Sequence, residues 1–218
     1  MIPLPSKPRT LPAIFPGILA AALFIPLFAI RRIGPFDFWW WMSLNAVAVM
    51  AYSFFSDRSY LKLIKDDLKT GLVKKILLGG VSAVLLYGFF YAGNEVSRVI
   101  FPFAENGINQ VYAFKEGASV LRMALLMIFL IGPGEEIFWR GFLQRRWQTR
   151  FGSLKGYWFA ALLYALVHLA SGNIMLVLAA GVCGLFWGAM FSRYRSVVML
   201  VVSHIVWDLM IFLIWVIH

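Results

Sequence analysis

The chain has 218 residues, of which 61% are hydrophobic and 14% are charged, and its mean hydropathy is +0.80. Soluble domains carry about 25% charged residues, so this composition excludes an ordinary soluble domain and indicates a polytopic membrane protein. The 20 Lys and Arg against 10 Asp and Glu are explained by loops that face anionic lipid, and we expect a lipid bilayer and no nucleic acid as partner. A single cysteine, Cys183, excludes a disulfide framework.

Seven apolar segments follow along the chain. A membrane span needs about 20 apolar residues, and fewer inside a bundle. The segments lie at about 11–30, 36–55, 76–94, 118–144, 156–170, 173–191 and 196–217. We therefore predict an all-α polytopic membrane protein, a bundle of about seven transmembrane helices that forms one domain over residues 1–218. The first segment resembles a signal peptide, but no small-residue cleavage site follows it, so we expect it to be retained.

The segment between the second and third spans is basic and contains Tyr60, Leu61, Ile64 and Leu68 near helical spacing. This pattern is typical of an amphipathic helix that lies in the membrane interface. An ordinary basic cytoplasmic loop explains the same residues equally well.

The distribution of basic residues predicts the orientation. Fourteen of the 20 Lys and Arg fall in loops on the N-terminal side of the seven segments and four on the opposite side, while Arg122 and Arg140 fall within segments. Cytoplasmic loops carry the excess of basic residues. We therefore predict a multi-pass protein of the cell (inner or plasma) membrane, with its N-terminus in the cytoplasm and its C-terminus outside. The nine tryptophans suit an interfacial belt or lipid-facing packing.

Three of the apolar segments contain ionisable residues, which in a membrane are costly and by default mark function. They are Glu135, Glu136 and Arg140 in the fourth segment, His168 in the fifth, and His204 and Asp208 in the seventh. At about 1.5 Å of rise per residue, Glu135, His168, His204 and Asp208 all lie roughly 12–18 Å from the basic side. Residues from three helices at one depth can converge on one site.

The fourth segment reads "LIGPGEEIFWRG" around its charges. Glu136 and Arg140 are four residues apart and can pair on one helix face, whereas Glu135 points about 100° away. Pro133 and Gly134 are expected to interrupt the helix, and the backbone groups that they free would need a polar cavity.

Carboxylates together with imidazoles suit two chemistries. A desolvated Glu can act as a general base toward water with His as its assistant, or the same side chains can ligate zinc. The chain contains neither the HExxH pattern of zinc peptidases nor the GxSxG pattern of serine hydrolases.

These residues, in this order, resemble the signature of the CPBP family, the CAAX-protease and bacteriocin-processing (Abi-type) intramembrane glutamic endopeptidases. The resemblance covers about residues 118–210, which we take as the catalytic core. The matching patterns are Glu135-Glu136-xxx-Arg140, Tyr164-xxx-His168 and His204-xxx-Asp208.

The resemblance implies a role for each residue. Glu135 would activate the attacking water with His168 assisting, and His204 and Asp208 would line the side where the oxyanion forms. Glu136, Arg140 and Tyr164 would support the site. The chain departs from the family pattern in two places: Tyr164 stands where Phe is usual, and Asp208 where many members have Asn. An ionised Asp208 would repel an oxyanion, so it must be protonated, orient His204 or bind a metal.

The leading hypothesis is therefore an endopeptidase that cleaves a membrane-inserted or membrane-anchored protein or peptide without a cofactor. Substrates of the resembling family include prenylated CAAX tails, bacteriocin leaders and C-terminal sorting signals. One alternative is a zinc-dependent protease with Glu135, His168, His204 and Asp208 as ligands. Another is a proton-coupled transporter that uses the same side chains as a relay, and a third is a non-catalytic membrane scaffold.

Overall fold

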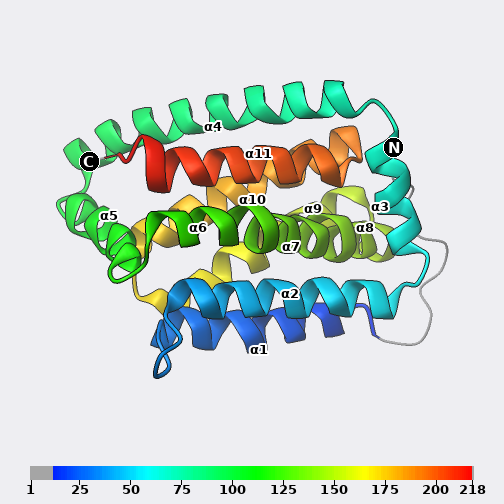
Figure 1. Cartoon of the computed structure of the whole chain (residues 1–218), viewed down its shortest axis with the longest axis horizontal. Coiled ribbons are helices and arrows are strands. Elements are labelled where there is room, and N and C mark those ends of the chain that lie inside the picture. The colour runs from blue at the N-terminus through cyan, green and yellow to red at the C-terminus, as the bar shows by residue number, and fades with distance from the viewer. Residues whose placement is uncertain (1–11, 218) are drawn as a thin grey trace.

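The computed structural model describes residues 12–217, which form a bundle of helices (Figure 1). Within this range no strand forms, and the only β-type pairing is an isolated bridge between Ile33 and Phe36. The helices of the first half are α1 (Phe15–Ile30), α2 (Phe38–Ser56), α3 (Tyr60–Lys69), α4 (Leu72–Ile100) and α5 (Ala104–Tyr112) with the 3-10 turn η1 (Ala113–Lys115).

The second half begins with one long helix of changing winding. It consists of α6 (Val120–Leu126), η2 (Met127–Ile131), α7 (Gly132–Glu135), η3 (Glu136–Gln144) and α8 (Arg145–Phe151). The chain continues through α9 (Ser153–Val167), η4 (His168–Ser171), α10 (Ile174–Tyr194), α11 (Val197–Leu209) and η5 (Met210–Ile214).

Every predicted apolar segment is helical over most of the residues that the structure describes, and differs from the prediction by a few residues at its ends. Among residues 12–217, three helices are long and apolar enough to cross a membrane, namely Leu72–Ile100, Ile174–Tyr194 and Val197–Ile214. Ala104–Lys115 and Val120–Phe151, which meet at 92°, would make a fourth span together. The all-α membrane fold is thus confirmed, while the number of seven spans stays a prediction.

The expected break at Pro133 does not occur. The helix passes through this region by widening into π-helical turns at Met127–Ile131 and Glu136–Gln144. Proline has no N–H and clashes with the preceding turn of a regular α-helix, and π turns are often found at functional sites. The prediction of an interrupted helix was wrong because a change of winding can accommodate Pro133 without a break.

The basic segment after α2 forms the helix α3, which decides between the two interpretations of this segment in favour of a helix. Tyr60 and Ile64 are buried against the bundle, whereas Leu61 and Leu68 are exposed. The buried face also includes Asp67, whose carboxylate accepts hydrogen bonds from α11. α3 therefore packs on the bundle through one face that carries both apolar and charged side chains.

The connections gather at the two ends of the bundle. At the end that holds α3, hydrogen bonds join Asp67 to Ser196 and Val198, Arg145 to Asp57, and Arg195 to Gln148. At the opposite end, where α5 lies (Figure 1), they join Arg31 to Ser171, Asn173 to Gly107, and Ile217 to Tyr112. The loops predicted to share the basic side therefore meet at one end. Lys7 and Arg9, which belong to the same prediction, lie outside the described residues.

The contact between α8 and α9 depends on Gly156, where an added Cβ would lie 2.2 Å from the backbone N of Gln148. We expect Gly156→Leu to lower the free energy of unfolding by about 3 kcal/mol or more, the upper end for an overpacked core, because backbone cannot move aside as a side chain can. Gly80→Leu is the control, since a Cβ there meets nothing within 4 Å. The measurement is unfolding of the two variants in detergent; equal stability would contradict the packing.

Candidate functional site

Two glycines let the helix that carries the carboxylates approach its neighbours. A Cβ on Gly134 would lie 2.8 Å from the backbone O of Ala46 in α2. A Cβ on Gly132 would lie 2.7 Å from the side chain of Ile205 in α11. Only glycine allows this spacing, so the "GPG" sequence places Glu135 between α2 and α11.

The centre of the site is the carboxylate of Glu136, which is fully buried. Its Oε1 accepts a hydrogen bond from Arg140 Nη1 at 2.8 Å and is 2.8 Å from His204 Nδ1. Arg140 Nη2 donates to the backbone O of Cys183 at 3.3 Å, and its guanidinium lies 4.4 Å from the ring centroid of Tyr164. The predicted pair of Glu136 and Arg140 is confirmed, and it joins the long helix to α9, α10 and α11.

The contact with Glu136 determines how His204 presents its ring. A carboxylate accepts hydrogen bonds, so Nδ1 carries the proton in this contact. The opposite nitrogen, Nε2, then lies 3.7 Å from Glu135 Oε2 and 3.5 Å from Asp208 Oδ2. The ring of Trp187 stacks on the imidazole with centroids 4.0 Å apart and fixes its plane.

A cavity of about 100 Å³ lies beside these atoms, and Glu135, Tyr164, His168, His204 and Asp208 line it. A water molecule needs about 10–15 Å³ of such space and two to four polar partners, so water can enter. The Tyr164 hydroxyl donates to Glu135 Oε2 at 3.2 Å. All five side chains are more than nine-tenths buried, so the cavity is a small polar space inside an apolar bundle.

His168 joins this cavity from the end of α9. Its Nδ1 is 2.7 Å from the backbone O of Tyr164. Because a carbonyl only accepts, Nδ1 donates, and Nε2 of the neutral ring is left as an acceptor. The ring packs 4.1 Å from that of Phe28 in α1. His168 can therefore accept a proton within the cavity.

The structure brings all seven predicted site residues together. Direct contacts connect Glu135, Glu136, Arg140, Tyr164, His204 and Asp208, and His168 joins them through Tyr164 and the shared cavity. Both carboxylates of the fourth segment face His204, although we expected them to point apart.

The sequence did not reveal the aromatic residues of the site. Five of the nine tryptophans are buried, namely Trp39, Trp139, Trp147, Trp187 and Trp207, so the expectation of mostly interfacial or lipid-facing tryptophans was wrong. Trp187 lies in the sequence "GLFWG", whose glycine spacing is typical of helix packing. The packing is present, since Gly184 lies against Ala161, but Trp187 also covers His204.

The positions of the side chains bear on the zinc alternative. Among residues 12–217, no three or more His, Cys, Asp and Glu side chains are arranged so that they could hold a metal ion. In this arrangement the set Glu135, His168, His204 and Asp208 does not fit a metal ion.

The fold and the site define a membrane protein with a buried centre of carboxylates and imidazoles. Residues 117–210 match the family model described as type II CAAX prenyl endopeptidase Rce1-like. This stretch is less than half of the chain but contains all seven site residues, and the match supports the resemblance to the CPBP/CAAX family of membrane proteases. No curated protein and no solved structure matches the chain.

Replacement of Arg140 by Met would leave the charge of Glu136 buried without its partner. We expect Arg140→Met to lower the free energy of unfolding by about 3–5 kcal/mol, as for other broken buried ion pairs. Adding Glu136→Gln should recover part of this loss, because the unpaired charge is then removed. Unfolding in detergent measures both effects.

Arg122→Met is the matched control, because the Arg122–Asp37 pair is partly exposed and should contribute less. An Arg140→Met protein as stable as the Arg122→Met protein would contradict the network described here.

Proposed function

We propose that the chain is an intramembrane endopeptidase in which Glu135 activates a water molecule to hydrolyse a peptide bond of a membrane-inserted or membrane-anchored substrate. The observation that supports this most is the convergence of Glu135, His168, His204 and Asp208 on one buried cavity. Solvation of ions in such a place is poor, and a carboxylate there is a strong base toward a confined water.

In the first step, Glu135 takes a proton from the water as the water oxygen attacks the carbonyl carbon of the scissile bond. His168 assists through its free Nε2, which can accept a hydrogen bond from the same water. The C=O π bond opens and the oxygen becomes an oxyanion. Collapse of this intermediate breaks the C–N bond, and the proton on Glu135 passes to the amine that leaves.

The oxyanion would form beside His204 and Asp208. A protonated Nε2 of His204 can donate to it, since Nδ1 is already used by Glu136. Asp208 helps only as a neutral acid or by orienting His204, whose Nε2 is 3.5 Å from Asp208 Oδ2. Glu136 and Arg140 do not react; they keep the imidazole of His204 in place.

The substrate belongs to the membrane because the site lies in an apolar bundle. Candidates are C-terminal sorting or anchor segments, leader peptides and prenylated CAAX tails. We further propose that the protein lies in the plasma or inner membrane with the α3 end in the cytoplasm, since the basic loops gather there and cytoplasmic loops carry the excess of basic residues.

Glu135→Gln should lower the rate of peptide cleavage by about 10²–10⁴-fold, the usual contribution of a general base. The assay uses purified protein in lipid nanodiscs with a panel of fluorogenic membrane-anchored peptides: prenylated CAAX peptides, leader peptides and C-terminal sorting segments. Glu105→Gln is the matched control, because Glu105 is exposed and does not line the cavity.

The same assay is repeated with a strong chelator. Cleavage that survives the chelator and is lost in Glu135→Gln supports the glutamate base. Loss with chelator and recovery with zinc would replace this proposal by the metal-dependent one. Cleavage of no peptide by the wild-type chain would favour the transporter or scaffold hypotheses.

Asp208 offers a second, independent test of the oxyanion side. Because an Asn side chain can donate a hydrogen bond, Asp208→Asn should keep the rate of cleavage within about tenfold of wild type. Asp208→Ala, which removes the group, should lower it by about 10²–10³-fold. Equal effects of the two substitutions on the cleavage rate would exclude this role for Asp208.

A further inference from the structure

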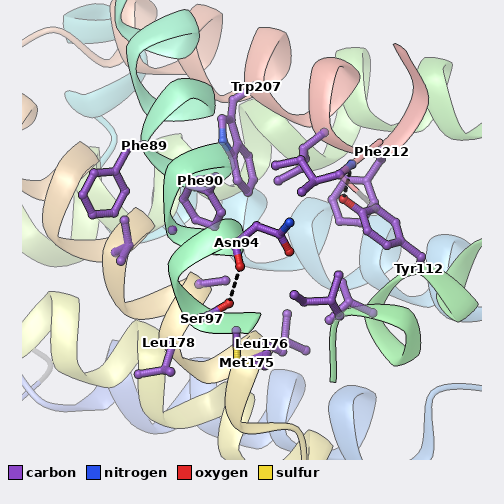
Figure 2. A pocket seen from close by; sticks show the side chains of 17 residues that line it. Phe89, Phe90, Asn94, Ser97, Tyr112, Met175, Leu176, Leu178, Trp207 and Phe212 are labelled. Atoms are coloured by element: carbon purple, nitrogen blue, oxygen red, sulfur yellow. Dashed lines mark hydrogen bonds between the residues drawn. The ribbon is translucent and has the colours of Figure 1, made fainter. Parts of the chain in front are cut away.

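A second pocket, of about 240 Å³, lies between α4, α5, α10 and η5 toward the α5 end of the bundle (Figure 2). It is larger than the apolar cavity of roughly 150 Å³ that binds benzene in an engineered protein. Its walls are mostly apolar, with Phe90, Leu176 and Trp207 among them. Phe89 and Leu178 are half exposed, and they mark its open side between α4 and α10.

One polar group in this pocket has no partner. Asn94 is 94% buried, since only 6% of its surface is exposed, and its Oδ1 has no hydrogen-bond partner among residues 12–217. Its Nδ2 donates to Glu95 at 3.3 Å, so the atom without a partner is the acceptor Oδ1. Figure 2 shows this side chain between Trp207 and Tyr112, inside the pocket. A buried acceptor without a donor is unfavourable, and a ligand that supplies a donor would remove this cost.

The pocket adjoins the cavity of the candidate active site. The two share walls made by Val111, Leu176, Ala179, Trp207 and Phe212. A peptide that occupied both the pocket and the cavity would therefore contact these residues.

We propose that this pocket binds an apolar stretch of the substrate peptide next to the scissile bond, with a backbone N–H that donates to Asn94 Oδ1. The proposal rests on the proposed function. A peptide supplies apolar side chains for the walls and a donor for Asn94, whereas an isoprenoid or fatty-acyl chain has no donor. A lone water is a poor occupant, because it needs two to four polar partners.

Photo-crosslinking tests binding without cleavage. The probe is a biotinylated leucine-rich peptide with one benzoylphenylalanine, presented to the full-length Glu135→Gln protein in nanodiscs. We expect crosslinks on α4 and α10. Methylation of the backbone nitrogen that faces Asn94 should weaken binding by about 3–10-fold, the value of one hydrogen bond, and Asn94→Leu should do the same.

Gly93→Phe tests the volume of the pocket. Gly93 lines the pocket, and a Cβ there meets no atom within 4 Å, so a phenyl ring can fill the space without displacing the helix. It should abolish the crosslinks. Gly88→Phe is the matched control, since Gly88 is also open but lies outside the pocket.

The outcomes separate this inference from the proposed function. Crosslinks that persist in Gly93→Phe would overturn the assignment of the pocket to the peptide. So would an alkyl-diazirine fatty acid that competes with the peptide equally in wild type and Asn94→Leu. Either result would do so even if the wild-type chain cleaves peptides. Specific crosslinks together with no cleavage of any peptide by the wild-type chain would support the binding site while the proposed catalytic function fails.

Discussion

The site depends on one buried carboxylate, that of Glu136. Removal of a charge from water costs several kcal/mol per ion, and the cost is offset only where partners surround it. Here Arg140 and His204 both bind Oε1, at 2.8 Å each. Arg140 reaches on to α10 through the backbone O of Cys183. The need to solvate one charge by protein thus draws together the long helix, α10 and α11.

The long helix changes its winding at the same place. The π-helical η3 carries Glu136 and Arg140, and π turns leave backbone groups that need other partners. Tyr60 of α3 supplies one, because its hydroxyl donates to the backbone O of Ile137 at 2.7 Å. Burial raises the pKa of Tyr60, so the hydroxyl stays protonated and remains a donor. α3 therefore supports the site from the basic end of the bundle.

The orientation of His204 is a consequence of both features. Glu136 holds one ring nitrogen and Trp187 holds the plane, so the other nitrogen is presented toward Glu135 and Asp208. Glu135, Asp208 and His204 therefore lie close together in the structure as it stands. The apolar pocket of about 240 Å³ shares lining residues with this cavity, so the two spaces adjoin.

The sequence by itself determined the all-α membrane fold class, the helical segments and the pair of Glu136 and Arg140, because hydropathy and i,i+4 spacing are local properties. It also placed Glu135, His168 and His204 at a common depth, since rise per residue is constant along a helix.

Only the tertiary structure decided how these groups meet. The widened turns around Pro133, the contact of Gly134 with Ala46 and the stacking of Trp187 on His204 each depend on a residue far away in the chain. A buried tryptophan and a lipid-facing one look alike in an apolar sequence. Two adjacent carboxylates face one partner only when the helix winding departs from 3.6 residues per turn. Such facts are set by packing between helices, which local sequence does not encode.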